Sequence, residues 1–319
     1  MFRTLTDLLA CPRCRASLRC EGSDPLDAGG RIETGSLLCD RGHRFRIDRA
    51  VPRLLPDAGA APTAPDVRAA FERQWRHFGR LRRIFGKDPA AMGRNLVNER
   101  MGSRIRAAWY RDRTVLDAGC GHGRYLRAFA DLGARVVGVD VGEGPLLAGV
   151  PTDDPRIHLV IGDVLSLPLR DASVDLAFCD GVLHHTPDPR RGFAELARVV
   201  KPGGAVYVWL YPKEGAVREA VFGAARAVTT RLPGVALRVL CFALAPLTAA
   251  VRSYSGTKFP RATWAECAQV VHDWLAPRLQ SHHTDEEIAG WAAAAGLVDA
   301  ERLPVPVGLV AWKPTVTPA

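Results

Sequence analysis

The ligand-binding core of this chain is predicted at residues 114–125, Thr-Val-Leu-Asp-Ala-Gly-Cys-Gly-His-Gly-Arg-Tyr. Val115 and Leu116 are typical of a buried strand, and the glycines after them predict a sharp turn. Apolar residues at helical spacing follow at Tyr125, Leu126, Phe129 and Ala130. A strand, a glycine-rich turn and a helix in this order let backbone approach a ligand with no Cβ in the way. We therefore expect a ligand-binding turn at three glycines, Gly119, Gly121 and Gly123.

An acidic residue ends the next predicted strand. Residues 135–139 lead into Asp140, which stands 21 positions after Gly119. In Rossmann-like folds an acid at the end of the second strand binds the ribose hydroxyls of a nucleotide. The glycine spacing is Gly-x-Gly-x-Gly, whereas a pyrophosphate is seated by Gly-x-Gly-x-x-Gly. The pattern therefore favours a ligand with an adenosine and no phosphate bridge over a dinucleotide.

Three further motifs follow along the chain. Gly162-Asp163-Val164 comes after a third strand pattern, and residues 178–188, Phe-Cys-Asp-Gly-Val-Leu-His-His-Thr-Pro-Asp, come at a fourth. Residues 198–204, Arg-Val-Val-Lys-Pro-Gly-Gly, precede a fifth. Together with the glycine turn, this set resembles the motifs of class I S-adenosylmethionine-dependent methyltransferases over residues 113–212. The resemblance implies an α/β fold with a Rossmann-like, seven-stranded sheet and S-adenosyl-L-methionine as cofactor.

The resemblance also implies cofactor contacts. Asp117 would lie near the amino group of the cofactor, and Asp140 would accept hydrogen bonds from both ribose hydroxyls. Asp163 would accept from the adenine amino group; the alternative is that its side chain only closes an Asx turn. The expected cofactor-binding residues are Asp117, Gly119, Gly121, Gly123, Asp140, Val141, Asp163, Val164 and Asp180.

A general base is needed only if the methyl acceptor is a hydroxyl or a similar acid. The candidates are His184 and His185 after the fourth strand, because an imidazole titrates near neutral pH. The alternative is that this pair shapes the cofactor pocket without moving a proton. The sequence lacks the Asn/Asp-Pro-Pro-aromatic motif of exocyclic amino methyltransferases. That absence disfavours methylation of adenine N6, cytosine N4 or glutamine amides.

Two pairs of metal-type ligands stand near the start of the chain, Cys11-Pro-Arg-Cys14 and Cys39-Asp-Arg-Gly-His43. Three thiolates and one imidazole in tetrahedral reach suit Zn²⁺. The protein fills all four positions, which predicts a structural site without a water ligand. A redox Cys-x-x-Cys is the alternative, but it leaves the second pair unexplained. Cys20 is expected to be a spectator.

The layout around these pairs resembles two kinds of zinc ribbon. One occurs in the activator subunits of methyltransferases that act on tRNA, rRNA and protein. The other precedes bacterial rRNA guanine-N1 methyltransferases. The Cys-x-x-x-His pair matches the second kind, and the exit at 51–56, Val-Pro-Arg-Leu-Leu-Pro, is closer to the first. Similar ribbons also precede methyltransferases of sugar and natural-product pathways, so the ribbon does not name a substrate.

The 319 residues suit two units, or one large domain with an appendage. We predict a zinc ribbon at 1–57, a linker and lid helices at 58–112, and a methyltransferase domain at 113–319. A helix at 66–83 is expected to fold over the cofactor, and a second helix is expected at about 96–110. Apolar residues recur at helical spacing in the first of these: Phe71, Trp75, Phe78 and Leu81.

Residues 213–283 are expected to form a helical insertion after the fifth strand, at the place where this fold commonly builds its acceptor pocket. Residues 232–251 have the length of a membrane span, but Arg238, Pro233 and Pro246 argue against one. An apolar lid, a homodimer face and a lipid-contacting surface remain as alternatives. A helix capped at Thr284 and running to 295 is expected next. Antiparallel strands at 297–303 and 305–312 should then complete the sheet.

The net positive charge of the chain comes from residues 1–112. Lys and Arg number 43 against 34 Asp and Glu, and residues 1–112 hold 22 against 13. This excess favours an anionic partner such as RNA, although arginines on solvated faces explain it equally well. Residues 1–10 lack the apolar run of a signal peptide, and the scattered cysteines fit a reducing compartment. We therefore expect a cytoplasmic protein.

Three functions remain open. The neutral charge of residues 113–319 and the apolar insertion favour a small or lipid-like metabolite as methyl acceptor. The alternative is methylation of an rRNA or tRNA base, with the basic N-terminal ribbon binding the RNA. A non-catalytic module that uses the cofactor fold to bind a partner is the third, and the intact motif set argues against it.

Overall fold

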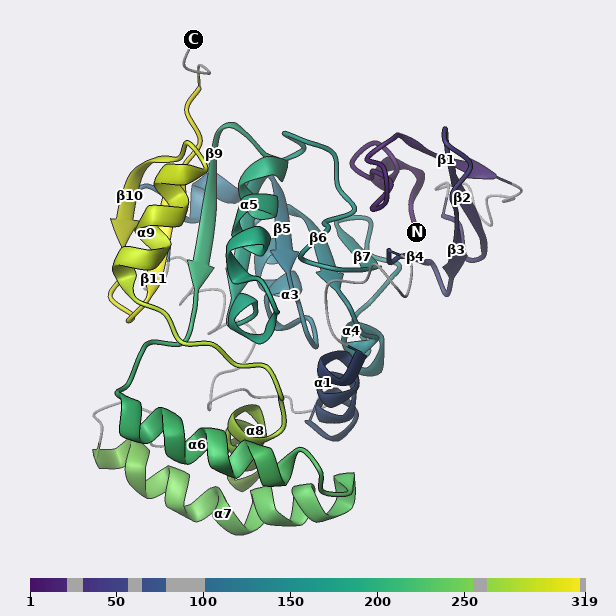
Figure 1. The fold of residues 1–319 in the computed structure, drawn as a ribbon. Coiled ribbons are helices and arrows are strands. Elements are labelled where there is room, and N and C mark those ends of the chain that lie inside the picture. The colour runs from purple at the N-terminus through teal and green to yellow at the C-terminus, as the bar shows by residue number, and fades with distance from the viewer. Residues whose placement is uncertain (22–30, 57–64, 79–100, 255–262, 316–319) are drawn as a thin grey trace.

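The computed structural model describes residues 1–21, 31–56, 65–78, 101–254 and 263–315 (Figure 1). Its strands form one sheet in the order β1-β2-β3-β4-β7-β6-β5-β8-β9-β11-β10. The seven strands from β7 to β10 in this order are those of the predicted methyltransferase sheet. The α/β fold class is therefore confirmed. The other strands belong to the N-terminal ribbon.

Five parallel strands carry the sequence motifs. They are β5 (Thr114–Ala118), β6 (Arg135–Asp140), β7 (Ile157–Gly162), β8 (Val174–Asp180) and β9 (Val200–Trp209). The predicted final pair is also present: β11 (Gly308–Trp312) runs antiparallel to β9, and β10 (Val298–Arg302) runs antiparallel to β11. Both β5 and β7 are buried along their whole length, as strands covered on both faces are.

Alternate strand residues face two separate hydrophobic layers. Val115 belongs to the layer that holds Phe129 of α3 (Arg124–Asp131). Leu116 belongs to the layer that holds Phe193 of α5 (Pro189–Val199) and Ile288 of α9 (Asp285–Ala294). Figure 1 shows α5 and α9 in front of the sheet. The helices therefore cover both faces, and the carboxyl ends of the parallel strands lie together at one edge.

The N-terminal ribbon is continuous with this sheet. Its strands β1 (Leu18–Glu21), β2 (Gly35–Cys39), β3 (Arg44–Asp48) and β4 (Val51–Leu54) pair antiparallel in sequence order. Strand β4 then pairs parallel with β7, with Leu54 opposite Gly162. Leu9 and Leu37 of the ribbon belong to the same hydrophobic layer as Leu116. The ribbon thus shares both a sheet and a core with the rest of the chain.

The region predicted to hold the lid helices agrees only in part. Helix α1 (Pro65–Phe78) matches the first predicted helix, whose residues 79–83 lie outside the described residues. The second predicted helix is wrong over its described part, because residues 101–106 are turn and coil before a 3-10 turn, η3 (Ala107–Tyr110). Gly102 has a φ of +65°, and the Ser103 N–H donates to Glu301 Oε2 at 2.9 Å. These features are incompatible with a continuous helix.

The predicted insertion is helical. It contains α6 (Ala216–Thr229), α7 (Gly234–Tyr254) and α8 (Trp264–Leu275). Helix α1 lies next to α8 and also next to α4 (Gly144–Leu147) (Figure 1). A small core joins Leu237 and Cys241 of α7 to Ala268 and Val271 of α8. Within the described part of the chain, no helix has the combination of length and apolar composition that crossing a membrane requires.

Candidate functional site

The glycine turn after β5 is closely covered by other parts of the chain. Gly119, Gly121 and Gly123 have φ values of +76°, +58° and +80°. A Cβ on Gly119 would lie 2.4 Å from Val182, and one on Gly121 would lie 2.8 Å from Trp75. Backbone geometry and space both require glycine here. The turn therefore lies in contact with the loop after β8 and with α1.

Asp140 ends β6 and faces this turn. Its Oδ2 accepts from the Gly121 N–H at 2.8 Å, and its Oδ1 accepts from the Gly142 N–H at 2.8 Å. Burial raises the pKa of Asp140 to about 6, although the two backbone hydrogen bonds act to lower it. Each carboxylate oxygen can accept a further hydrogen bond. The geometry is compatible with two ribose hydroxyls, and this assignment stays a prediction.

Asp117 lies at the end of the neighbouring strand β5. It is 2% exposed, and its Oδ2 has no hydrogen-bond partner among the described residues. Burial raises the pKa of Asp117 to about 8, Arg124 acts to lower it, and the charges of Asp180 and Asp140 raise it further. A buried carboxylate oxygen without a donor is costly unless a ligand supplies one. The position therefore fits the cationic amino group of an amino-acid-like ligand.

Asp163 and Val164 form the turn after β7. The Leu165 N–H donates to Asp163 Oδ1 at 2.8 Å, and the Ser166 N–H donates to the Asp163 carbonyl at 3.1 Å. This is the Asx-turn geometry that was the alternative to adenine binding. The turn contact is therefore present, and the contact of Asp163 with adenine stays a prediction.

Asp180, at the end of β8, is held by three side chains. Arg124 Nη2 and the Tyr125 hydroxyl donate to its Oδ2 at 2.9 and 2.7 Å. The Tyr207 hydroxyl donates to its Oδ1 at 3.0 Å. Asp180 thus fixes Arg124, whose charge acts on Asp117. These partners give Asp180 a positioning role, and its predicted contact with the cofactor is untested.

His184 and His185 lie in a short turn, η4 (Leu183–His185), and both are buried. The Tyr211 N–H donates to His184 Nδ1 at 3.3 Å, which places the His184 proton on Nε2. His185 Nδ1 lies 3.1 Å from the Leu279 carbonyl oxygen, which places the His185 proton on Nδ1. Burial lowers the pKa of both rings, that of His185 to about 4. Both are neutral near pH 7, and only His185 presents a lone pair on Nε2.

The two ends of the insertion meet beside these histidines. The Ser281 N–H donates to the His184 carbonyl at 2.8 Å, and the His283 N–H donates to the Tyr211 carbonyl at 2.8 Å. The ring of His184 also stacks on Tyr211, with centroids 3.8 Å apart. The sequence did not predict these contacts, because they join segments far apart in the chain.

Helix α1 joins the glycine turn to the insertion. Trp75 stacks on His122 of the turn, with ring centroids 4.6 Å apart, and Phe71 meets the edge of His185 at 5.1 Å. Gln74 Oε1 lies 3.1 Å from His272 Nδ1 of α8. The helical spacing of Phe71 and Trp75 predicted a packed face, but it did not reveal these partners. The buried Gln74 carried no sequence signal.

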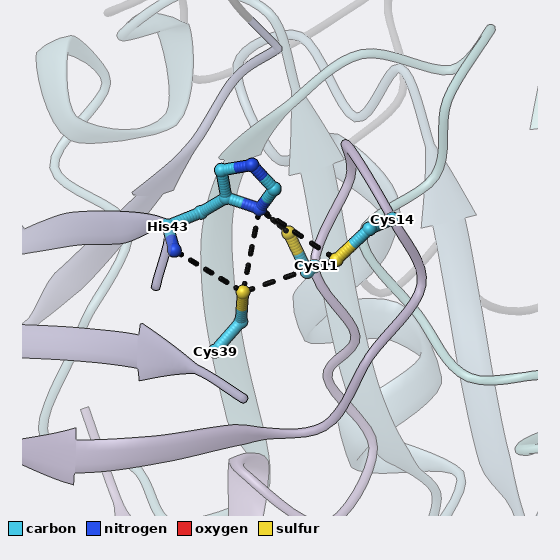
Figure 2. Close-up of side chains that lie close together, drawn as sticks. All are labelled: Cys11, Cys14, Cys39 and His43. Atoms are coloured by element: carbon cyan, nitrogen blue, oxygen red, sulfur yellow. Dashed lines mark hydrogen bonds between the residues drawn. The ribbon is translucent and has the colours of Figure 1, made fainter. Parts of the chain in front are cut away.

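The four predicted metal ligands converge (Figure 2). The His43 Nδ1 atom lies 3.4, 3.6 and 3.3 Å from the Sγ atoms of Cys11, Cys14 and Cys39. The Sγ atoms of Cys14 and Cys39 lie 3.8 Å apart. Donor atoms about 2.1–2.3 Å from a tetrahedral Zn²⁺ lie roughly 3.4–3.8 Å from one another. The geometry therefore fits Zn²⁺, and Cys20 is outside the cluster.

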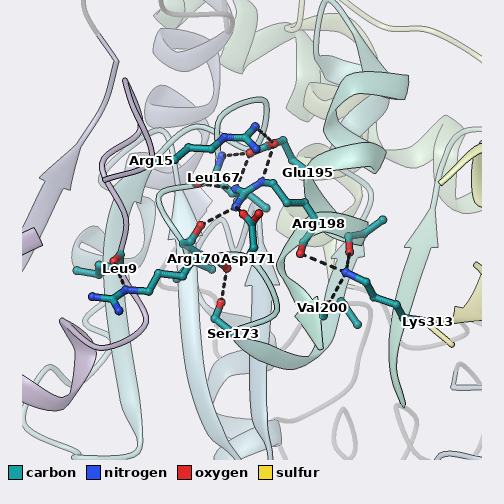
Figure 3. Close-up of polar contacts among 12 residues, drawn as sticks. Leu9, Arg15, Leu167, Arg170, Asp171, Ser173, Glu195, Arg198, Val200 and Lys313 are labelled. Carbon is teal, nitrogen blue, oxygen red and sulfur yellow. Dashed lines mark hydrogen bonds and ion pairs between the residues drawn. The ribbon is translucent and has the colours of Figure 1, made fainter. Parts of the chain in front are cut away.

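The turn at 11–14, which carries two of the predicted metal ligands, contacts the turn at 163–169, where adenine binding is predicted. The Ser166 hydroxyl donates to the Pro12 carbonyl at 2.8 Å, and the Ala10 N–H donates to the Pro168 carbonyl at 3.1 Å. Figure 3 shows Glu195 as the centre of a second link. Its carboxylate accepts from Arg15 Nη2 at 2.8 Å and from the Leu167 N–H at 2.9 Å.

Arg198 completes that second link. Its Nη2 donates to Glu195 Oε2 at 2.7 Å and to the Leu167 carbonyl at 3.0 Å. Burial lowers the pKa of Arg198, but hydrogen bonds and charge from Glu195 and Asp171 outweigh burial and raise it overall. The turn at 163–169 is therefore held between the ribbon and α5.

The residues of this site were compared with families of known proteins. Residues 116–208 match the family model described as a methyltransferase domain. The match runs from β5 to β9 and includes the glycine turn, Asp140 and the histidine pair. The chain thus carries a methyltransferase domain, and the predicted class of enzyme is confirmed for this domain.

Individual relatives match parts of the chain. A probable S-adenosylmethionine-dependent methyltransferase of Mycolicibacterium smegmatis is 40% identical over 163 residues, 50% of this chain and 53% of that protein. A demethylmenaquinone methyltransferase of Clavibacter sepedonicus is 27% identical over 64% of this chain and 74% of that protein. The Burkholderia thailandensis 1,6-didemethyltoxoflavin-N1-methyltransferase structure aligns at 24% identity and a TM-score of 0.40, over 64% of this chain and 72% of that one. The chain spans about half the length of most of the curated relatives it matches.

Proposed function

We propose that this protein transfers a methyl group from S-adenosyl-L-methionine to a small or lipid-like metabolite. The observation that carries the cofactor assignment is the buried Asp117 carboxylate, whose Oδ2 lacks a partner beside the glycine turn. The domain match over 116–208 and the name of the Mycolicibacterium relative support the same cofactor. The relative named for demethylmenaquinone and the apolar insertion support the acceptor class.

The cofactor would be held at the carboxyl ends of neighbouring strands. Asp117 would pair with its amino group, Asp140 would accept from the ribose hydroxyls, and Asp163 with Val164 would face the adenine. When bound, the cofactor supplies an electrophilic methyl group on its sulfonium. The protein must then place the acceptor in line and exclude water, for which α1, packed on Gly121, provides a cover.

His185 is our candidate for a base when the acceptor is a hydroxyl or a similar acid. Its Nδ1 proton is donated to the Leu279 carbonyl, so Nε2 has the lone pair that can accept a proton. His184 has the opposite tautomer, since Tyr211 donates to its Nδ1. We therefore assign proton acceptance to His185 and give His184 the role of holding the loop through Tyr211.

We infer that Cys11, Cys14, Cys39 and His43 bind a structural Zn²⁺. The separations of their donor atoms support tetrahedral binding, and the protein supplies all four ligands. The metal would fix the turn at 11–14, and Pro12 of that turn accepts from Ser166 next to the adenine turn. Zinc binding would therefore order one wall of the cofactor site.

An rRNA or tRNA acceptor receives less support. Several basic side chains of the N-terminal region are engaged in ion pairs with acidic neighbours. The pairs are Arg19–Asp40, Arg44–Glu21, Arg49–Glu143 and Arg53–Asp48. Charge that is already neutralised contributes less to phosphate affinity.

The cofactor assignment is tested by calorimetry with Asp117→Asn. The variant keeps the shape of the side chain but cannot ionise to pair with the cationic amino group, so we expect its affinity for S-adenosylmethionine to fall by about tenfold or more. Asp131→Asn is the matched control, because Asp131 is an exposed acid on α3. Unchanged affinity in folded Asp117→Asn, with folding verified by circular dichroism, would remove Asp117 from the site.

A further inference from the structure

The insertion exposes apolar side chains on two helices. On α6, Val217, Val221 and Val228 are 81%, 62% and 63% exposed, and Ala224 lies on the same stripe at helical spacing. On α7, Val235, Val239 and Leu247 are 72%, 63% and 62% exposed. We call these two stripes the outer apolar surface. Among the described residues, the large apolar side chains that are exposed lie in the insertion, except for Val298.

These exposed residues are not part of the face that packs the insertion. The opposite side of α7 buries Leu237, Cys241 and Ala245 against α8. A helix that is apolar on both sides while only one side is covered calls for a second apolar environment. Figure 1 places α7 at the end of the insertion farthest from the sheet, where it can reach an external surface.

The net positive charge of residues 216–254 indicates what kind of external surface the apolar stripes contact. Residues 216–254 contain five arginines, one glutamate and no other charged residue. Arg231 and Arg238 are exposed, and neither makes an ion pair within the described part of the chain. Apolar stripes bordered by arginines match a membrane interface with anionic lipids, where acyl chains take the apolar face and headgroups take the charge.

A second copy of the chain is the rival occupant. In a twofold dimer the same surface meets itself, so the arginines of one copy would face those of the other. A lipid bilayer meets no such repulsion. The described helices also do not span a membrane, which leaves a position in the plane of the interface.

We propose that the outer apolar surface docks on an anionic lipid bilayer. This docking goes beyond the proposed function, because it can be measured without any methyl transfer. It would hold α7 in the headgroup region and place α8 on the protein side. Through the contact between His272 and Gln74, α8 is connected to α1, which covers the glycine turn.

The test is co-sedimentation of the full chain with vesicles. Vesicles of phosphatidylcholine mixed with phosphatidylglycerol should bind the protein, and vesicles of phosphatidylcholine alone should bind it about tenfold less. Val221→Glu on α6 and Val239→Glu on α7 should each weaken binding by about tenfold, because each puts a charge into the lipid. Val298→Glu, at the exposed valine outside the insertion, is the matched control and should bind as the wild type does.

Three results would overturn the proposal. The first is that wild-type protein does not sediment with phosphatidylglycerol vesicles. The second is equal binding by the wild type and both insertion variants, with folding verified by circular dichroism. The third is a lipid-free dimer that Val221→Glu or Val239→Glu dissociates while neither variant alters vesicle binding; this would assign the surface to a second copy.

Discussion

Three carboxylates lie at the ends of adjacent strands, and each has a different set of hydrogen-bond and ion-pair partners. Asp180 pairs with Arg124 and accepts hydrogen bonds from two tyrosine hydroxyls. Asp140 accepts two backbone N–H groups. Asp117 is buried with an oxygen that lacks a partner among the described residues. Of the three, Asp117 is therefore the carboxylate best placed to bind a positive group from a ligand, and the cofactor amino group is expected there.

The stability of the cofactor-free protein should depend on pH through Asp117. The folded-state pKa of Asp117, about 8, lies above the ordinary 3.8, so the folded protein holds this proton where the unfolded chain has lost it. The cofactor-free protein should therefore lose stability as pH rises from about 4 to about 8. Asp117→Asn should remove that loss, so its advantage in Tm over the wild type should grow across this range. A pH-independent difference in Tm would contradict the burial of an uncompensated charge.

The second prediction separates the two histidines. If the acceptor is a hydroxyl, His185→Gln should lower kcat by about a hundredfold and leave cofactor affinity unchanged, as loss of a general base does. Because its pKa is about 4, His185 is neutral at higher pH, so wild-type kcat should fall only as the pH approaches that value. His184→Gln should instead destabilise the protein, since His184 is wholly buried. Wild-type kcat in His185→Gln would show that no base acts there.

Among the elements, the ribbon and the proposed cofactor site are in contact through one turn. The ligand turn at 11–14 and the turn at 163–169 share the Pro12–Ser166 hydrogen bond and the Glu195 link to Arg15. We therefore propose that metal binding at the first turn strengthens cofactor binding at the second, and by thermodynamic linkage the effect should be reciprocal.

The prediction for this element uses two cysteines of the ribbon. Cys39→Ser should lose the metal and lower both the Tm and the affinity for S-adenosylmethionine, because the turn at 11–14 loses its anchor. Cys20→Ser is the control, since Cys20 lies in the ribbon but outside the cluster. Metal analysis and calorimetry measure the two effects. Loss of zinc with unchanged cofactor affinity would show that the ribbon is independent of the site.

Local patterns predicted the elements better than their contacts. The glycine turn, the position of Asp140 at a strand end and the convergence of the two Cys/His pairs follow short sequence patterns, so spacing was sufficient to predict them. The helix expected at 96–110 was wrong in its described part, because the Gly102 turn and the contact of Ser103 with Glu301 depend on a distant strand. The partners of Asp180 were missed for the same reason, since Tyr207 lies on another strand.

At the scale of the whole molecule, one sheet joins the ribbon to the methyltransferase domain. The pairing of β4 with β7 extends the seven predicted strands without a break. Strand pairing between distant segments leaves no local signal in a sequence, so the sequence did not predict that the strands of residues 1–57 join this sheet. The continuous sheet connects the proposed metal site to the proposed cofactor site.

Methyl transfer to a small or lipid-like acceptor can be measured by following the methyl group itself. Zinc-loaded protein is incubated with methyl-labelled S-adenosylmethionine and a cell extract, which is then separated into RNA, protein, polar metabolites and an organic phase. We predict label in the metabolite or organic fractions with the wild type and with Asp131→Asn, and its loss with Asp117→Asn. Label that accumulates in RNA or protein, or no transfer to any fraction, would contradict the account.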